Sequence, residues 1–273
     1  PVFSDKRLSP AHLVDTCGTG GDGCETFNIS TAAAIVASAA SASVAKHGNR
    51  AASSRCGSAD VLEALGVRID IPLERCGEAI REIGLGFLFA PTAHSATRHA
   101  TAARKQIGQR TAFNLLGPLT NPAGAHSQLV GVYSIEVIDL MAATLAELGV
   151  QRAFVVHGAD GLDEISLSGE THVAELREGA LMRYTVTPED FGMSRSPLET
   201  LRGGNAPENA AFIREVLEGQ PGPRRDIAII NAAAALVAAG IAANFHDGAK
   251  LAANAISSGL AQKKLAALVA FTN

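Results

Sequence analysis

The feature that most constrains this chain is a glycine-rich segment, Cys17–Asp22 (CGTGGD), set between a short apolar stretch and an alanine-rich run. His12–Thr16 comes before it and predicts a strand. Asn28–Thr31 (NIST) comes after it and is typical of a helix N-terminus, and Ala32–Ala45 then predicts a helix. A strand, a glycine loop and a helix in this order indicate an α/β fold in which backbone N–H groups and a helix dipole face one anion.

The two common nucleotide-binding templates do not fit this loop. The chain has no GxxxxGK[ST] segment, and no GxGxxG precedes a helix with a ribose-binding acid. The alternative is a plain turn between strand and helix. Three glycines within four positions, followed by Asp22, favour a loop that lets the backbone approach a phosphate.

Composition limits the classes of protein that the chain can belong to. With 47% hydrophobic and 18% charged residues among 273, it can bury a sizeable core, as one large domain or one large and one small domain. A net charge of −4 favours neither nucleic acid nor a membrane surface as a partner. Four cysteines without a CxxC pair, and the absence of a secretory signal, predict free thiols in the cytoplasm. Ile227–Ala243 is too short for a membrane span and predicts a buried helix.

A second polar segment, Lys46–Ser58 (KHGNRAASSRCGS), is interpreted as a loop and precedes a short predicted helix, Ala59–Leu65. It combines one lysine, two arginines and three serines with two glycines. Hydroxyl and backbone donors fix phosphate oxygens, and cationic side chains neutralise them. The segment therefore predicts a phosphate cradle, and the alternative is a solvated basic loop.

A third segment, His157–Glu164 (HGADGLDE), follows the predicted strand Ala153–His157. That strand, the strand Leu129–Tyr133 and the helix Glu136–Leu148 between them form a βαβ unit, which implies a parallel sheet. Ligands bind beyond the carboxyl ends of such strands. Two adjacent carboxylates there, Asp163 and Glu164, suit Mg²⁺, and the alternative is an acidic surface turn.

The remaining elements complete the α/β pattern. We expect helices over Pro72–Ile83, over the basic segment Thr92–Ile107 and from Ala206 onward, and strands over Gly86–Ala90 and within Ile165–Tyr184. The basic helix is either part of a site or a solvated surface. Gly117-Pro118 and Asn121-Pro122 are expected to break the chain.

Taken together, six segments resemble the anthranilate phosphoribosyltransferase family. They occur in the family's order and are Asp15–Asp22 (DTCGTGGD), Asn28–Thr31 (NIST), Lys46–Glu63 (KHGNRAASSRCGSADVLE), Phe89–His94 (FAPTAH), Arg104–Pro122 (RKQIGQRTAFNLLGPLTNP) and His157–Glu164 (HGADGLDE). The resemblance implies transfer of the 5-phosphoribosyl group from phosphoribosyl pyrophosphate (PRPP) to the amine of anthranilate, with Mg²⁺, in tryptophan biosynthesis.

The resemblance also implies roles for individual residues. Asn49 and Arg104 would contact anthranilate, and Ser30, Asp163 and Glu164 would bind the metal. No single catalytic residue is implied, because the loops and Mg²⁺ would stabilise the transition state. The substrate-binding residues would be Gly18, Gly21, Asp22, Thr26, Asn28, Ile29, Ser30, Thr31, Lys46, His47, Gly48, Asn49, Arg50, Ala51, Ala52, Ser53, Ser54, Ser58 and Arg104.

The family's domain plan gives the expected architecture. Residues 12–91 and 121–273 would form a large α/β domain with a mainly parallel sheet surrounded by helices, and residues 92–120 a remnant of a small helical domain. Only fourteen residues precede Asp15, so the family's N-terminal helices are expected to be absent. The resemblance implies a homodimer for the family, and the reduced helical domain argues against one for this chain.

Two rival hypotheses stay open. A pyrimidine nucleoside phosphorylase would share the fold and a glycine-rich phosphate loop, but the pair Asp163 and Glu164 argues against it. A non-catalytic, nucleic-acid-binding relative would share the fold alone, and the net charge of −4 argues against that.

Overall fold

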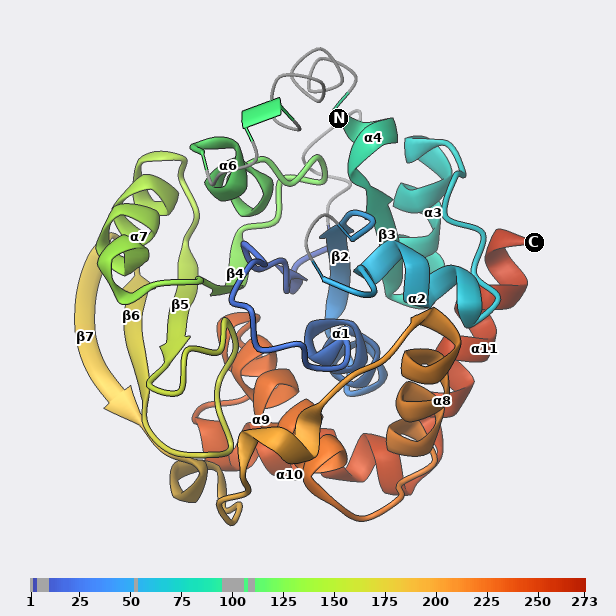
Figure 1. Cartoon of the computed structure of the whole chain (residues 1–273). Coiled ribbons are helices and arrows are strands. Elements are labelled where there is room, and N and C mark those ends of the chain that lie inside the picture. The colour runs from blue at the N-terminus through green and yellow to red at the C-terminus, as the bar shows by residue number, and fades with distance from the viewer. Residues whose placement is uncertain (1, 4–9, 52–53, 95–105, 108–110) are drawn as a thin grey trace.

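A seven-stranded mixed sheet forms the centre of the molecule (Figure 1). The computed structural model describes residues 2–3, 10–51, 54–94, 106–107 and 111–273. The strand order is β3-β2-β1-β4-β5-β6-β7. The first five strands in that order are parallel to one another. Strand β6 pairs antiparallel with β5, and β7 pairs antiparallel with β6. The strands are β1 Leu13–Asp15, β2 Ser43–Gly48, β3 Leu85–Phe89, β4 Ser127–Gly131, β5 Arg152–Gly158, β6 Thr171–Arg177 and β7 Ala180–Val186.

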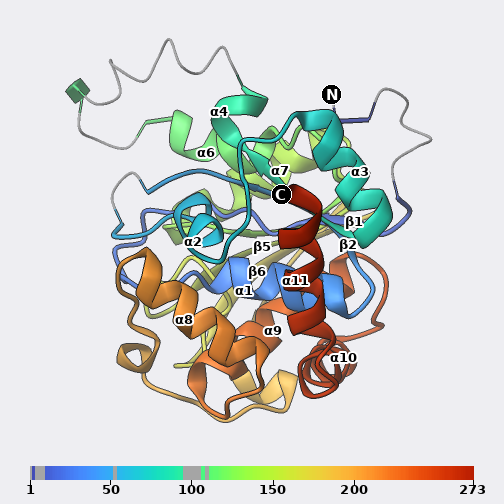
Figure 2. The same cartoon turned by 90° about the vertical axis from the view of Figure 1, so that its right-hand side faces the viewer.

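Helices cover both faces of this sheet (Figures 1 and 2). One face packs on α1 Ile29–Ala39, α8 Ala206–Leu217, α9 Pro223–Ala238, α10 Phe245–Ser257 and α11 Leu260–Thr272. The other packs on α3 Leu73–Ile83 and α7 Ile138–Glu147. The short helices α2 Ser58–Ala64, α4 Ala90–Ala93 and α6 Phe113–Leu119 lie in the connections. Three 3₁₀ turns are η3 Ile135–Val137, η4 Pro188–Phe191 and η5 Leu198–Leu201. The expected α/β fold with a mainly parallel sheet is confirmed.

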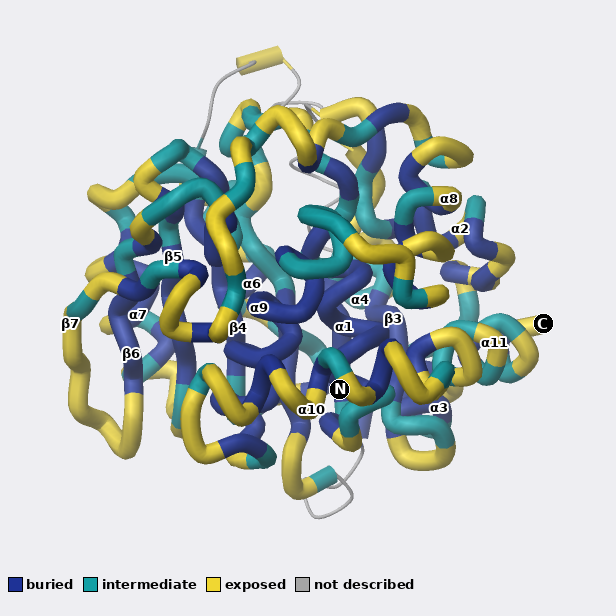
Figure 3. The backbone as a smooth tube through the Cα atoms, turned by 90° about the horizontal axis from the view of Figure 1, so that it is seen from below, coloured by how far each residue is buried: buried dark blue, intermediate teal, exposed yellow. Residues whose placement is uncertain are grey.

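Small side chains allow the helices to pack closely beneath the sheet. Every residue of α9 from Ile227 to Ala238 is buried, and six of these twelve residues are alanines. A Cβ added at Gly248 of α10 would lie 2.8 Å from the carbonyl oxygen of Ala233. Figure 3 shows the resulting contrast between a buried interior and an exposed β7 edge. No helix in the described residues is long and apolar enough to cross a membrane.

Two local predictions were wrong. The helix expected over Ala32–Ala45 ends at Ala39, and Ser43–Gly48 is strand β2, so Lys46–Gly48 is not loop. Because β2 lies inside the sheet with buried residues on both faces, its sequence shows no polar alternation, and its alanine and serine content resembles the preceding helix. Gly117-Pro118 lies inside α6 instead of breaking the chain, although the helix ends one residue later. The expected helix Thr92–Ile107 falls largely outside the described residues.

The parallel strands direct their carboxyl ends to one edge of the sheet. The loops after β1, β2, β4 and β5 therefore gather at that edge, which is where open α/β sheets bind ligands. Three of these four loops are the segments singled out from the sequence.

Candidate active site

The glycine loop is fixed to the end of the neighbouring strand β4. Thr19 N donates a hydrogen bond to Gly131 O at 2.9 Å, and Thr19 Oγ1 accepts one from Tyr133 N at 3.1 Å. Gly20 and Gly21 have φ angles of 63° and 80°, in the left-handed region that favours glycine. A Cβ at Gly18 would lie 3.0 Å from Gly131 O. The glycines thus serve both the turn and the close approach to β4.

Gly131 is a site residue that the sequence analysis missed. A Cβ there would lie 1.4 Å from the carbonyl oxygen of Asp163, closer than any side chain allows. The end of β4 therefore touches the backbone of the carboxylate loop directly. The signal was present in the sequence, because a glycine inside an apolar strand marks a close approach of another backbone.

Three acidic residues, Asp22 of the glycine loop and Asp163 and Glu164 of the loop after β5, lie near one another. Asp163 N donates to Asp22 Oδ2 at 3.3 Å. Burial, with the charges of Asp22 and Glu164, raises the pKa of Asp163 well above its ordinary value. Burial also raises the pKa of Glu164 to about 8, although Lys46 and hydrogen bonds from Ser30 act in the opposite direction. The predicted pair Asp163 and Glu164 is thus joined by Asp22, which had been predicted to bind substrate.

This donor set fits a hard divalent cation. Carboxylate and hydroxyl oxygens from Asp22, Asp163, Glu164 and Ser30 are the ligand types that Mg²⁺ prefers. The raised pKa values have the same cause, because crowded and buried carboxylates are stable as anions only when a positive charge compensates them.

Lys46 supplies a cation from the opposite side of the cluster. Its side chain is buried, and Nζ donates to Thr16 O at 3.3 Å, to Thr16 Oγ1 at 3.4 Å and to Ser30 Oγ at 3.3 Å. Its positive charge also opposes the rise in pKa that burial causes at Glu164 and at Asp15. One buried lysine therefore lies between two carboxylate regions.

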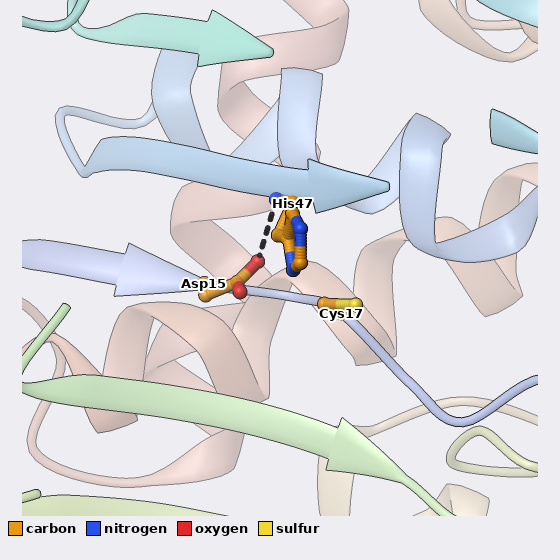
Figure 4. A group of neighbouring side chains, drawn as sticks. All are labelled: Asp15, Cys17 and His47. Atoms are coloured by element: carbon orange, nitrogen blue, oxygen red, sulfur yellow. Dashed lines mark hydrogen bonds between the residues drawn. The ribbon is translucent and has the colours of Figure 1, made fainter. Parts of the chain in front are cut away.

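The second carboxylate region is centred on Asp15, at the end of β1. Oδ1 accepts from His47 N at 3.1 Å (Figure 4), and Oδ2 accepts from Asn121 Nδ2 at 2.7 Å. Burial raises the pKa of Asp15 to about 6 against the lowering effect of these donors and of Lys46. Asn121 also donates to Ala45 O at 2.8 Å, so it joins β1 to β2.

Asp15, Cys17 and His47 bring potential metal ligands within 4.8 Å of one another (Figure 4). Their chemistry is a poor match for a metal. Both oxygens of Asp15 already accept hydrogen bonds, and burial raises the pKa of the Cys17 thiol above its ordinary range. Thiols bind metals as thiolates, so this cluster is structural, and the carboxylates around Asp163 fit a cation better.

His47 of this cluster lies next to a second histidine, His94. His47 Nδ1 donates to Gly117 O at 3.0 Å, and its Nε2 lies 3.2 Å from His94 Nε2. Burial lowers the pKa of His47 to about 4 and also lowers the pKa of His94. A neutral His47 with its proton on Nδ1 accepts from His94 through Nε2.

Ion pairs with the following helix α2 hold the loop after β2 in place. Arg50, predicted to bind phosphate, pairs with Asp60 at 3.0 Å and with Glu63 at 2.5 Å. Asp60 Oδ2 accepts from Ala51 N and Gly57 N, each at 2.9 Å, and Ser58 Oγ donates to Asn49 O at 3.3 Å. The Arg50 guanidinium is therefore occupied by protein carboxylates. Ser54 lies in the same loop, and Ala52, Ser53 and Arg104 lie outside the described residues.

Asn28 and Thr26 hold the glycine loop to the C-terminal helices. Asn28 begins α1 but makes no side-chain cap, and its Nδ2 donates to Cys56 O at 3.1 Å. Its Oδ1 accepts from Asn209 Nδ2 at 2.9 Å. Thr26 pairs with Arg202 in an isolated β-bridge. In the predicted stretch Asn28, Ile29, Ser30 and Thr31, Asn28 thus joins the loop after β2 to α8, and Ile29 and Thr31 are buried.

Comparison with known families agrees with this arrangement. The family model described as "Glycosyl transferase family, a/b domain" matches residues 10–262, which include every loop described above. The fold and the site are therefore those of this class of transferase domain.

Individual relatives narrow the class. The anthranilate phosphoribosyltransferase of Moorella thermoacetica is 55% identical over 266 residues, which are 97% of this chain and 78% of the relative. The crystal structure of the Thermus thermophilus anthranilate phosphoribosyltransferase has a TM-score of 0.90 at 51% identity, covering 95% of this chain and 78% of that one. The Saccharomyces cerevisiae enzyme, solved in complex with PRPP and Mg, has a TM-score of 0.88 at 31% identity, covering 98% and 77%. The chain belongs to the anthranilate phosphoribosyltransferase family.

Proposed function

We propose that the chain transfers the 5-phosphoribosyl group of PRPP to anthranilate, giving N-(5-phosphoribosyl)anthranilate and pyrophosphate, in tryptophan biosynthesis. The observation that carries the proposal is the meeting of Asp22, Asp163 and Glu164 with Ser30 and Lys46 at the edge of the sheet. A carboxylate cluster beside a glycine loop and a helix N-terminus suits a metal-bound diphosphate. Family membership, and the yeast relative solved with PRPP and Mg, support the same substrate.

The glycine loop and the start of α1 would hold the diphosphate and ribose. Backbone N–H groups of Gly18 and Gly21, with the side chains of Asn28 and Ser30, offer donors on one side, and Lys46 offers a cation on the other; Thr31 is fully buried and would contribute through the backbone of α1. The loop Asn49–Ser58 would continue this site. Because Arg50 is paired with Asp60 and Glu63, these ion pairs must open before its guanidinium binds a phosphate.

Asp163, Glu164 and Ser30 would hold Mg²⁺, which when bound neutralises charge that develops on the departing pyrophosphate. Cleavage at the anomeric carbon builds oxocarbenium character there, as in glycoside hydrolysis. The aryl amine of anthranilate is neutral near pH 7, so the protein's task is positioning more than proton removal. We propose that Asn49 contacts anthranilate, and that Arg104 binds its carboxylate in a bidentate manner.

We also propose the wider setting of this activity. Residues 12–91 and 121–273 would form the large domain, and residues 92–120 would belong to a small helical domain that carries the family's dimer contact. The four cysteines are free thiols, which supports a cytoplasmic location.

The direct test is loss of anthranilate fluorescence when the protein is mixed with anthranilate, PRPP and Mg²⁺. We expect turnover that requires all three components. Reactions without PRPP, and reactions with EDTA in excess of Mg²⁺, serve as controls. Absence of turnover together with phosphorolysis of thymidine would replace our proposal with the pyrimidine nucleoside phosphorylase hypothesis.

A further inference from the structure

The carboxylate loop after β5 is anchored from beneath by one polar residue of α9. Asn231 is fully buried in a helix face that otherwise consists of alanine and aliphatic side chains. Burying an amide costs free energy unless its hydrogen bonds are made. Its position therefore calls for a specific partner.

That partner is the backbone of Ile165, the residue that follows Glu164. Asn231 Oδ1 accepts from Ile165 N at 3.0 Å, and Asn231 Nδ2 donates to Ile165 O at 3.0 Å. Nδ2 also donates to Ile227 O, one helical turn earlier, at 3.0 Å. The amide thus holds both polar groups of one residue, as a neighbouring strand would, and both of its own N–H groups are used.

Other contacts hold the same loop to itself and to β4. Asp160 Oδ2 accepts from Ser166 Oγ and from Ser168 Oγ, each at 2.6 Å. The carbonyl of Asp163 presses against Gly131, where even a methyl group has no room. These contacts shape the loop, whereas the hydrogen bonds of Asn231 fix the position of the loop relative to α9.

We propose that Asn231 is a positioning residue for the metal-binding carboxylates Asp163 and Glu164. The inference rests on the proposed function, because it assigns those carboxylates to Mg²⁺. An outward displacement of Ile165 would carry the adjacent Glu164 and Asp163 away from Asp22, whose Oδ2 accepts a hydrogen bond from Asp163 N at 3.3 Å. The two hydrogen bonds to Ile165 oppose that displacement and keep the oxygens together for the ion.

The chain offers a matched control in Asn209 of α8. It is equally buried, with an exposed fraction of 1%, and it also clamps a loop through its amide. Nδ2 donates to Asn28 Oδ1 at 2.9 Å, and Oδ1 accepts from Gly204 N at 2.7 Å. Asn209 therefore supports the start of α1 and leaves the carboxylate loop untouched.

The experiment compares Asn231→Leu with Asn209→Leu, since leucine keeps the branched shape of asparagine and its side chain makes no hydrogen bonds. Mn²⁺, used as a probe for Mg²⁺, is titrated into each protein without substrates, and the free ion is measured by electron paramagnetic resonance. The Mg²⁺ concentration that half-activates turnover at saturating PRPP is the second readout. We expect Asn231→Leu to weaken both about tenfold, as supporting residues of metal sites do, and Asn209→Leu to change them less than twofold and to raise the KM for PRPP.

Equal metal affinity in wild type and Asn231→Leu, or an equal loss in Asn209→Leu, would overturn the inference. If Asn231→Leu does not fold, Asn231→Ser and Asn209→Ser replace the pair, because serine keeps a hydroxyl for Ile227 O but is too short for Ile165. Wild-type protein that binds Mn²⁺ without consuming anthranilate would contradict the proposed function alone, and the Mn²⁺ titrations would still decide the role of Asn231.

Discussion

Two carboxylate regions lie on either side of Lys46, and they are stabilised in different ways. The inner one, Asp15, has a hydrogen-bond donor for each oxygen, His47 N at 3.1 Å and Asn121 Nδ2 at 2.7 Å. The outer one contains Asp22, Asp163 and Glu164, and burial together with the charge of Asp22 raises the pKa values of Asp163 and Glu164. Asp15 is fully buried, whereas the three residues of the outer region are only partly buried.

The two regions differ in the groups that compensate the negative charge of their carboxylates. Asp15 is compensated by protein donors, which fix the ends of β1 and β2 relative to each other. The outer carboxylates have more negative charge than Lys46 and the Ser30 donors balance, so they are suited to receive a cation. We therefore expect substitutions in the outer region to act on metal-dependent activity, and substitutions around Asp15 to act on stability.

The largest effect is expected for Asp163→Asn combined with Glu164→Gln. Both changes keep size while removing the two charges that would hold Mg²⁺. Loss of metal stabilisation worth several kcal/mol corresponds to a fall in kcat/KM of about 1000-fold or more. Steady-state kinetics across a Mg²⁺ series would measure it, with circular dichroism as the check on folding. Activity that still rises with Mg²⁺ to the wild-type level would remove both residues from the metal site.

A smaller effect is expected for Gly131→Ala. Its new Cβ would start 1.4 Å from Asp163 O, so the carboxylate loop or the end of β4 must move. A displacement of roughly 1 Å in such a site can cost about 100-fold in rate. Gly169→Ala, in the same loop but with no atom within 4 Å of the new Cβ, is the control and should keep wild-type kcat/KM. Equal activities of the two variants would show that the contact at Gly131 does not position Asp163.

The inner region is tested by Asn121→Ala. This change removes the donor to Asp15 Oδ2, and a hydrogen bond to a charged group contributes about 2 kcal/mol. The pKa of Asp15 is about 6 in the folded protein and would rise further in the variant. A raised folded pKa means that stability is lost as pH rises through it. The loss relative to wild type should therefore be largest at pH 7 and above, and smaller at pH 5.

Urea unfolding of Asn121→Ala and wild type at pH 5 and pH 7.5 would measure these differences. The half-activating Mg²⁺ concentration should stay near the wild-type value, since the outer region is untouched. An equal destabilisation at both pH values would mean that Asn121 acts by packing and through its bond to Ala45 O, not through the charge of Asp15.

The same two regions show how far sequence reasoning extends. The glycine loop and the pair Asp163 and Glu164 are contiguous segments at strand ends, so residue type and order predicted their loops. Asn121, Asn209 and Asn231 were missed as supporting residues, because their partners lie between 66 and 181 positions away in the chain. Asn231 is a polar residue in the apolar run Ile227–Ala243, but nothing local indicates which loop it holds.

Strand β2 illustrates a second limit. Its first residues, Ser43 to Ala45, have the same kinds of side chain as the helix before them, and only pairing with β1 and β3 makes them a strand. Arg50 illustrates a third, because a basic residue in a phosphate-like loop is paired with Asp60 and Glu63 of the helix that follows. Composition indicated the chemistry of that loop, whereas the partner of the Arg50 guanidinium is set by carboxylates of the neighbouring helix α2.

The smallest expected effect is the pH dependence of metal binding to the outer region. Burial raises the pKa of Glu164 to about 8 and also raises that of Asp163, so at pH 6 protons compete with a cation for these oxygens. Displacing one proton below pH 8 makes apparent affinity rise about tenfold for each unit of pH. Mn²⁺ titrations at pH 6, 7 and 8 would measure the slope, and the double variant of Asp163 and Glu164 should show none. A wild-type affinity that is constant from pH 6 to 8 would mean that the outer carboxylates are already ionised before the cation arrives, and that Lys46 and Ser30 compensate them as fully as Asn121 and His47 compensate Asp15.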